Sequence, residues 1–385
     1  MHIFRRYLRL ISFIAITILS YAGSDMVMAQ QIQFPQRWHE SIDDIQPFTH
    51  QDTLKICIAG DVMMHSKQIS NASISSGEFD FLPWFEHVRD MVSSADISVA
   101  NMEFPLAGEP YTGYPAFSAP DIIAECMAAC GFDVLLAANN HIYDKGCKGA
   151  MRTVETYRKL EKEHGVTFTG IAEDMASRKK NNPLILKKKN ISIAIINCTY
   201  GTNLGADAPW PKVNYLNDRE TIARALRIAE KEADFSIVLP HWGIGNDLLH
   251  STDQENTARW LSDNGADLIA GSHPHTVQDT ENIGRNTQVA YSLGNMVSNM
   301  SAPDTQIGLI AEIRLIRTTN GTFKADPMEF TYIWCSRPGG YCSTYKILPV
   351  KRFLGTREQW QGKWEYDKMV STYKRVMETT GIKDK

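Results

Sequence analysis

The chain has 385 residues, 40 basic against 44 acidic side chains, and a formal net charge of −4. This mild acidity disfavours nucleic-acid binding, and an acidic substrate would need a local basic or metal site to hold it. The length is enough for one large domain or two ordinary domains.

Residues 1–29 have the pattern of a secretory signal peptide. Arginines come first, Leu10–Ala22 is mostly apolar, and Val27–Ala29 offers a small-residue cleavage site. The apolar run is short for a membrane span, which favours cleavage, with an uncleaved anchor as the alternative. In both cases we expect the rest of the chain to be exported, periplasmic or in the cell envelope or outside the cell. It would touch a membrane only through an uncleaved signal segment.

Residues 30–53 are polar and are predicted to form a lead-in segment, followed by alternating strands and helices. Apolar runs with β-branched residues predict strands at Leu54–Ala59, Ile97–Ala100, Phe132–Ala138, Phe235–Pro240 and Asp267–Ala270. Helical patterns lie at Leu82–Ser94, Pro120–Cys130, Gly149–His164, Asp218–Ala233 and Thr252–Gly265. This alternation predicts βαβ units, in which ligands gather at the carboxyl ends of the strands.

From about Gln288 the chain is richer in strands and turns. Strands are predicted at Gln288–Leu293, Gln306–Ile316 and Ala325–Trp334, and a helix near Trp360–Thr379. Because no linker separates the two regions, residues 54–350 are predicted to form one α/β sandwich whose second sheet comes partly from this half. Residues 351–385 would be a C-terminal helical tail. Lys187–Asn190 is predicted to be the solvated tip of a hairpin.

The seven cysteines, an odd number, do not define a disulfide framework. Cys335 and Cys342 flank the turn-rich segment 336–341, so we expect a disulfide that closes a hairpin there. Cys126 and Cys130 are spaced as neighbours on a helix. They are either a structural pair or, as we favour, two core residues.

Polar residues follow the predicted strands. In chain order they are Asp61, Glu103, Asn140 with His141, His241, and His273 with His275. Residues two apart in an extended segment face the same way, so His273 and His275 can share one cleft, although a His-Pro-His loop alone could be a polar turn. Carboxylate, amide and imidazole donors together suit Zn, Mn or Fe better than Mg or Ca, and their number allows one or two ions.

Six short motifs carry these residues: Gly60–Met63, Asn101–Glu103, Ala138–His141 with Asp144 and Gly146, His241–Gly243, Gly271–His275 and Tyr291–Asn295. Together they resemble the successive motifs of the CapA family, the poly-γ-glutamate capsule synthesis proteins. The family's fold is similar to that of calcineurin-like metallophosphoesterases. The resemblance, which spans about Leu54 to Ser298, therefore implies a four-layer αββα sandwich of the metallo-dependent phosphatase type, with a metal cleft at the strand ends.

The resemblance also implies roles for individual residues. The implied metal ligands are Asp61, Glu103, Asn140, His241, His273 and His275. His141 is implied as the general acid or phosphate-contacting residue, and Asp144 would orient it. The alternative for Asn140 and Asp144 is that they cap the following helix. Ser292 and Asn295 are candidates for substrate contact or for a turn.

Two positions depart from these families. Calcineurin-like enzymes begin with Asp-x-His, whereas the third position here is Met63, a poor ligand for a hard dication, so one metal position is expected to be weak or empty. His65 could replace it if the loop bends back, although a lone histidine there is more often at the surface. The Glu-Tyr pair that commonly follows His-Trp-Gly in the family is absent from Ile244–Asp247, so its substrate contacts cannot be transferred.

These observations predict an exported, metal-dependent hydrolase or transferase that acts on phosphoester or amide bonds of an anionic envelope polymer such as poly-γ-glutamate. Metal-activated water or a polymer nucleophile would attack, and His141 would give a proton to the leaving group. The expected partners are the polymer and an envelope export or synthesis complex. The alternative is a non-catalytic polymer-binding or export assembly factor with a degenerate metal cleft, which Met63 favours.

Overall fold

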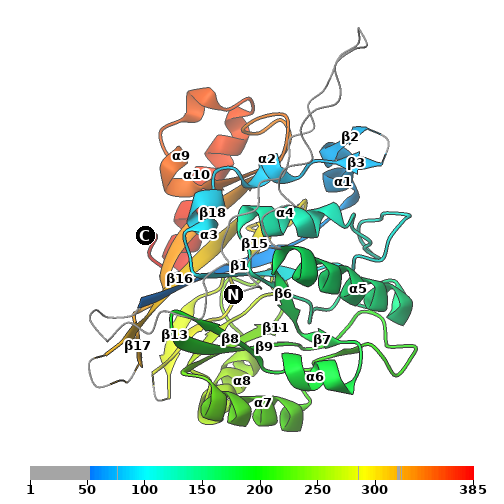
Figure 1. Cartoon of the computed structure of the whole chain (residues 1–385). Helices are drawn as coiled ribbons and strands as arrows, with labels where there is room; N and C mark the ends of the chain where they lie inside the picture. Colours follow the sequence, from blue (N-terminus) through cyan, green and yellow to red (C-terminus); the bar gives the residue numbers. More distant parts are fainter. Residues whose placement is uncertain (1–52, 76, 285, 319–320, 322) are drawn as a thin grey trace, which may run out of the picture. The chain divides into compact units, whose positions relative to one another are not determined.

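The computed structural model describes residues 53–75, 77–284, 286–318, 321 and 323–385. The predicted signal peptide, 1–29, and the predicted lead-in segment up to residue 52 lie outside the described residues. Two β-sheets with helices on their outer faces form the described part of the chain (Figure 1). None of its described helices combines the length and the apolar character needed to cross a membrane.

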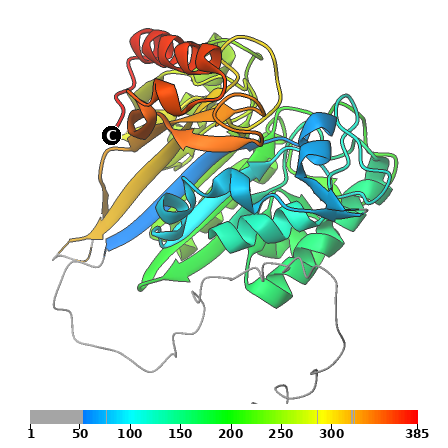
Figure 2. The same ribbon diagram turned by 90° about the horizontal axis from the view of Figure 1, so that it is seen from above.

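The first sheet is mixed, with the strand order β19-β18-β16-β1-β4-β5-β6. Its parallel strands are β1 (Thr53–Val62), β4 (Ile97–Met102), β5 (Val134–Leu136) and β6 (Thr167–Thr169). Its antiparallel strands are β16 (Ile307–Arg317), β18 (Glu329–Ser336) and β19 (Lys346–Pro349), with β17 (Phe323–Ala325) paired to β16. Figure 2 shows β1 and β16 side by side.

Strand β15 (Asn295–Val297) lies in parallel beside the carboxyl end of β1, where Asp61 is the register partner of Asn295. The approach of the two backbones is close, because a Cβ on Gly60 would stand 1.9 Å from the carbonyl oxygen of Gly294. This contact explains why the aspartate of the first motif is preceded by glycine.

The second sheet has the order β13-β14-β12-β11-β9-β8. Its strands are β8 (Leu184–Lys188), β9 (Ile191–Thr199), β11 (Phe235–His241), β12 (Leu268–Ala270), β13 (Thr280–Ile283) and β14 (Thr287–Ala290). The four central strands are parallel, and β8 and β13 are antiparallel edges. The region after about residue 288 therefore gives β14 to this sheet and its remaining long strands to the first sheet.

Each predicted helix has a counterpart in the structure, whereas the short helices at 66–72, 175–181 and 350–353 were not predicted. The helices are α1 (Ser66–Ala72), α2 (Leu82–Phe85), α3 (Arg89–Ser93), α4 (Ile122–Cys130), α5 (Gly146–His164), α6 (Met175–Asn181), α7 (Arg219–Glu232), α8 (Thr252–Asp263), α9 (Val350–Phe353) and α10 (Lys363–Thr380). Short strands β2 (Ser73–Ser75) with β3 (Glu78–Phe79) and β7 (Ile171–Ala172) with β10 (Lys212–Val213) form two small ladders.

Local chemistry fixes several of these helix ends. Asp218 and Ser251 accept hydrogen bonds from the backbone N–H of Thr221 and Gln254, which starts α7 and α8 with a satisfied first turn. Gly131 ends α4 in the left-handed region at φ 98°, where a side chain would be strained. These three helix ends are therefore set by their own cap residues.

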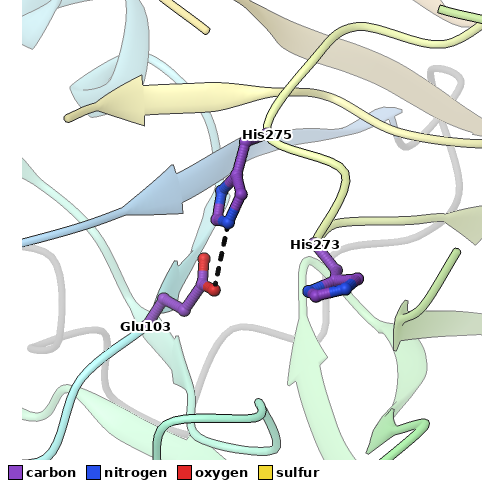
Figure 3. Close-up of side chains that lie close together, drawn as sticks. All are labelled: Glu103, His273 and His275. Atoms are coloured by element: carbon purple, nitrogen blue, oxygen red, sulfur yellow. Dashed lines mark ion pairs between the residues drawn. The ribbon is translucent and has the colours of Figure 1, made fainter. Parts of the chain in front are cut away.

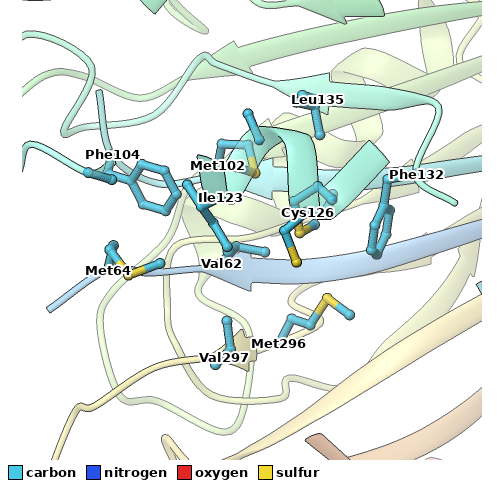
Figure 4. Packing of buried hydrophobic residues seen from close by; sticks show 14 of the residues in the cluster. Val62, Met64, Met102, Phe104, Ile123, Cys126, Phe132, Leu135, Met296 and Val297 are labelled. Carbon is cyan, nitrogen blue, oxygen red and sulfur yellow. The ribbon is translucent and has the colours of Figure 1, made fainter. Parts of the chain in front are cut away.

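Side-chain alternation along the strands defines four layers. On β1, Cys57 and Ala59 belong to a core shared with the helices α2 to α5, whereas Ile56 and Ile58 belong to the core between the two sheets. Figure 4 shows a part of the first core, in which Val62 of β1 packs near Ile123 and Cys126 of α4. On β11, Val238 packs in a third core with α7 and α8. Each fully buried aliphatic side chain contributes about 1.5–3 kcal/mol. The predicted four-layer αββα sandwich is confirmed.

Helix α10 extends the core between the sheets. Met369 and Tyr373 of α10 share this core with Tyr332 and Trp334 of β18. Helix α10 thus covers a part of the first sheet on the same face as the second sheet. The helix predicted near Trp360–Thr379 is confirmed.

Two predictions about elements meet different outcomes. The hairpin tip is confirmed, because Lys189 and Asn190 both have positive φ between β8 and β9. The single helix predicted at 82–94 is divided into α2 and α3 by a turn in which Val88 N–H bonds to the carbonyl of Phe85, three residues back. This tight turn keeps both Val88 and Val92 in the core.

The predicted Cys335–Cys342 disulfide is wrong. Both are free thiols: the Cys335 Sγ donates to the Ser298 carbonyl at 3.3 Å, and the Cys342 Sγ to the Thr344 carbonyl at 3.5 Å. The reason is the register, since Cys335 on β18 lies opposite Ile347 and not Cys342. Cys126 and Cys130 are buried free thiols, as the core interpretation predicts.

Candidate metal centre

The predicted site residues follow strands from both sheets. Asp61 lies near the end of β1 and Glu103 directly after β4, its parallel neighbour in the first sheet. His241 ends β11, and His273 and His275 follow β12, its parallel neighbour in the second sheet. The carboxyl ends of the two sheets therefore bring these five side chains together, as expected for this class of fold.

Asp61, Glu103 and His241 form the first group of donors, with ligand atoms all within 4.8 Å of one another. His241 Nε2 lies 3.5 Å from Glu103 Oε1 and 2.9 Å from the side-chain oxygen of Asn140. Two ligands of a four-coordinate ion with bonds of about 2.1 Å are about 3.4 Å apart. The spacing of these donors is therefore compatible with a single bound ion.

Glu103, His273 and His275 form the second group, within the same 4.8 Å limit (Figure 3). His275 Nε2 lies 3.7 Å from Glu103 Oε1, and its Nδ1 lies 3.6 Å from Asp61 Oδ2. The ring centres of His241 and His273 are 4.8 Å apart. Glu103 belongs to both groups, so its carboxylate lies between two candidate ion positions.

The two groups fit a divalent cation. Within the described part of the chain, both carboxylate oxygens of Glu103 and Nδ1 of His273 are buried without a hydrogen-bond partner. Leaving such atoms unpaired is costly, and a cation is the partner that a buried carboxylate lacks here. Burial raises the pKa of Glu103 to about 8. A cation would reverse this effect by favouring the charged form.

His241 and His273 are neutral near pH 7, as metal ligands must be. Burial lowers the pKa of His241 to about 3 and that of His273 to about 2. Their imidazoles therefore keep a lone pair available for a metal over the physiological range.

Hydrogen bonds orient the donors. Asn101 Nδ2 donates to Asp61 Oδ1 at 2.7 Å, and the backbone N–H of His273 donates to Asp61 Oδ2 at 3.1 Å. His241 Nδ1 lies 2.9 Å from the hydroxyl of Ser272, so a proton held on Nδ1 would leave Nε2 for an ion. Neither Asn101 nor Ser272 was predicted as a site residue, although both lie inside the motifs that carry the ligands.

Asn295 and Ser292 have different surroundings. The Asn295 side-chain oxygen lies 3.1 Å from His275 Nδ1, which makes Nδ1 the donor and leaves Nε2 to face Glu103. Ser292 is buried, donates to the Thr276 carbonyl and accepts from Gly294 N–H, which matches the turn alternative. Asn295 therefore positions a candidate ligand.

The His-Pro-His segment is not extended, so the reason given for its convergence is wrong. His273 and His275 have φ of 99° and 61°, in the left-handed region. The two side chains meet Glu103 because the backbone turns on both sides of Pro274. Such strain costs about 1–3 kcal/mol per residue and is typical of functional sites.

His141 and Asp144 form a buried pair beside the donors. His141 Nδ1 lies 2.7 Å from Asp144 Oδ2, which also accepts from the backbone N–H of Phe117. Burial lowers the pKa of His141, but the hydrogen bond to Asp144 and the charge of Glu103 outweigh it, so the net pKa is raised. His141 is therefore well suited to hold a proton near neutral pH.

The capping alternative for Asn140 and Asp144 is not supported. Helix α5 begins at Gly146 after Lys145, and no side chain caps its first turn. Asn140 instead presents its side-chain oxygen to His241, as described above, and Asp144 is bonded to His141.

Met63 and His65 belong to neither donor group. Met63 is buried in the core beneath the first sheet, where its sulfur accepts a hydrogen bond from Ser298. His65 is half-buried, bonds to Gln68 and places its ring edge-on to Phe117. The position that a histidine occupies in calcineurin-like enzymes is thus filled by a core thioether.

The loop after β9 supplies two residues that sequence analysis missed. The ring of Tyr200 lies 4.6 Å from the ring of His273. Asn203 donates its backbone N–H to the Asn140 carbonyl, and its side chain lies 3.2 Å from His141 Nδ1. The strand-end rule applied to β9 would have indicated this loop, because β9 ends at Thr199 in the same parallel sheet.

The sandwich and its strand-end donors together define a metallophosphatase-like protein with a candidate site for a divalent metal. A family model described as "Bacterial capsule synthesis protein PGA_cap" matches residues 55–300. The chain belongs to this family, which confirms the resemblance to CapA proteins found in the sequence motifs.

Individual relatives agree with this assignment. The chain is 28% identical over 300 residues to "Capsule biosynthesis protein CapA" of Bacillus anthracis, covering 74% of this chain and 69% of the relative. It is 26% identical over 286 residues to "PGA biosynthesis protein CapA" of Bacillus subtilis, covering 72% of each. A phosphatase structure from Mycoplasma pneumoniae aligns at 13% identity and a TM-score of 0.45, over 74% of this chain and 95% of that one. A TM-score at this level is too low to transfer a function.

Proposed function

We propose that this protein is a metal-dependent hydrolase or transferase that acts on an anionic capsule polymer of the poly-γ-glutamate type, outside the cytoplasm. The observation that carries the proposal is Glu103, a buried carboxylate without a hydrogen-bond partner in the described chain, placed between two groups of metal donors. A purely structural role would not require this costly arrangement. The names of the two Bacillus relatives support the polymer, and the predicted signal segment supports export.

The residues divide the chemical work as follows. Glu103 with His273 and His275, and Asp61 with His241 and Asn140, would hold one or two divalent ions. Bound metal supplies Lewis acidity and lowers the pKa of water toward neutrality. His141 holds a proton beside the donors and gives it to the leaving group, and Asp144 keeps the imidazole oriented during this transfer.

This arrangement suits two kinds of scissile bond. A phosphoester and a γ-glutamyl amide both have an oxygen that a divalent ion polarises and a leaving group that a histidine protonates. In a transferase, a polymer end would take the place of water. Mn, Zn and Fe remain the expected metals, because imidazole donors suit them better than Mg or Ca.

The second candidate function is a binding or assembly factor that holds polymer for an export complex without turnover. Met63 favours it, because a core thioether replaces a residue that binds metal in calcineurin-like enzymes. Loss of one ligand weakens one ion position while leaving the cleft residues in place.

The test combines metal analysis with turnover. Purified protein is expected to hold Mn, Zn or Fe and to cleave a model phosphoester or a γ-glutamyl amide. His273→Ala should lower turnover at least about 100-fold. His87→Gln, a histidine outside both donor groups, is the control and should leave turnover unchanged. Wild-type protein that binds metal and polymer without turnover would support the assembly factor instead.

A further inference from the structure

A cavity of about 610 Å³ has two cationic side chains among its lining residues. The residues that matter here are Lys67, Ser70, Asn71, Asn299, Arg337 and Tyr345. None of them is among the donors of the centre. The chain as a whole is acidic, with a net charge of −4, but this cavity is lined by two cations and no acidic residue.

Several residues that line the cavity follow strands that also carry residues of the candidate metal centre. Helix α1 follows β1, which delivers Asp61, and it presents Lys67, Ser70 and Asn71 on one face because they are three and four residues apart. Asn299 follows β15, whose Asn295 contacts His275.

Arg337 reaches the same edge from the antiparallel half of the sheet. Strand β16 is antiparallel to β1, and β18 is antiparallel to β16, so β18 runs in the direction of β1. Arg337 comes directly after β18. Arg337 therefore lies at the same end of the first sheet as Asp61 and Glu103, which lie at the carboxyl ends of the parallel strands.

A series of ring contacts connects Asn299, which lines the cavity, to His141. The backbone N–H of Asn299 donates to His65 Nδ1 at 3.4 Å. The His65 ring is edge-on to Phe117, and Phe117 is edge-on to His141, with ring centres 5.3 and 4.6 Å apart. The lining of the cavity is thus connected to His141 through the packed rings of His65 and Phe117.

The two cations of the cavity are not neutralised. In the described chain neither Lys67 nor Arg337 has a carboxylate within 4.0 Å of its side-chain nitrogens, and Nε and Nη2 of Arg337 are buried without a partner. The oxygens of the neighbouring Glu365 accept from Gln306, Ser336 and the backbone N–H of Arg337. A covered guanidinium without a counter-ion favours binding of an anion.

We propose that this cavity is a subsite for a carboxylate of the polymer, held by Arg337 and Lys67 next to the reacting unit. The inference rests on the proposed function, since it names how the substrate's own charge is recognised. Arg337 contributes a guanidinium that stays charged at any physiological pH, and Lys67 adds a second cation. Phosphate shares this chemistry, and the experiment separates the two. Arg337 lies beyond residues 55–300, so the subsite uses a part of the chain outside the family match.

The experiment measures binding to metal-free protein by calorimetry at low salt. The probes are γ-linked tetraglutamate, the same oligomer with its carboxylates converted to carboxamides, and inorganic phosphate. Arg337→Gln should weaken tetraglutamate binding about tenfold or more, and Lys67→Met about threefold to tenfold. Arg227→Gln on α7 and Lys162→Met on α5, exposed cations elsewhere, should bind like the wild type.

The outcomes separate the subsite from catalysis. The proposal predicts that the carboxamide oligomer binds wild-type protein no better than tetraglutamate binds Arg337→Gln. Unchanged affinity in Arg337→Gln and Lys67→Met, or no binding by wild-type protein, would overturn it. Tighter binding of phosphate than of tetraglutamate would also overturn it and assign a phosphate subsite. Because no step requires turnover, an inactive wild-type protein leaves this test valid. Melting curves of each variant check that it is folded.

Discussion

Two buried glutamates in this molecule differ in how their surroundings treat the carboxylate. Glu103, at the candidate metal centre, and Glu365, where α10 meets β18, both have no exposed surface. Glu365 accepts hydrogen bonds from Gln306, Ser336 and the backbone of Arg337. Both oxygens of Glu103 are without such donors in the described chain. Burial raises the pKa of both groups.

The difference separates a structural carboxylate from a functional one. The fold surrounds Glu365 with donors, so this side chain stabilises the junction of helix and sheet. Around Glu103 the fold places other metal donors, and in the described chain none of them donates a hydrogen bond to its carboxylate. Glutamate-to-glutamine substitution should therefore lower turnover at Glu103 and lower stability at Glu365.

The largest expected effect is on turnover in Glu103→Gln. The variant keeps the size of the side chain but loses the charge shared by both donor groups. We expect turnover to fall at least about 100-fold and bound metal to be lost. Metal-free Glu103→Gln should melt at the same temperature as metal-free wild type or higher, because an unpaired buried charge is removed. A large drop in melting temperature would show that Glu103 stabilises the fold as Glu365 does, and would contradict its functional role.

Asp144→Asn should have the next largest effect, about 10–100-fold on turnover. Asp144 is both hydrogen-bonded by the fold, like Glu365, and part of the site, like Glu103. Its Oδ2 accepts from Phe117 N–H and orients His141. Without its charge the raised pKa of His141 falls, so the alkaline limb of the pH–rate profile should move to lower pH. A profile that keeps its shape while the rate falls would indicate that Asp144 acts only through folding.

Glu365→Gln should change stability and not chemistry. The amide keeps some of the hydrogen bonds of Glu365 but loses the charge that strengthens them, so we expect a loss of about 1–2 kcal/mol in the free energy of unfolding. Denaturant unfolding measures it. Turnover per folded molecule should stay at the wild-type value. A loss of turnover without a loss of stability would contradict the structural role.

The smallest expected effect is a difference in pH dependence. The pKa of Glu103 is raised from 4.5 to about 8, so the folded metal-free protein holds this proton over a range in which the unfolded chain releases it. Its contribution to stability is complete below about pH 4.5 and is lost as the pH rises toward 8. Metal-free wild type should therefore lose stability relative to Glu103→Gln over this window. Parallel stability curves for the two proteins would show that Glu103 does not titrate there.

Much of the fold and of the centre could be predicted because both depend on local patterns. Apolar runs ending in polar residues placed Asp61, Glu103 and His241 at strand ends, and parallel strands bring such ends together. The reasoning for His273 and His275 was wrong although the two converge, because their left-handed backbone depends on tertiary contacts that no local pattern encodes.

Other features depend on register and on distant chain segments. The Cys335–Cys342 disulfide was predicted from spacing, but the pairing of β18 with β19 gives Cys335 another neighbour. Asn203 reaches the centre from a polar loop with no motif of its own. Arg337 joins a cavity with Lys67 only because two antiparallel strands bring it back to the edge where β1 ends.

The central claim is that Glu103 and the strand-end histidines bind a divalent metal. Anomalous scattering from a crystal of the protein loaded with Mn or Zn tests it most directly. We expect a peak within about 2.0–2.3 Å of Glu103 and of at least two donors among Asp61, His241, His273 and His275. A loaded crystal with no anomalous peak at bonding distance from Glu103 would contradict it.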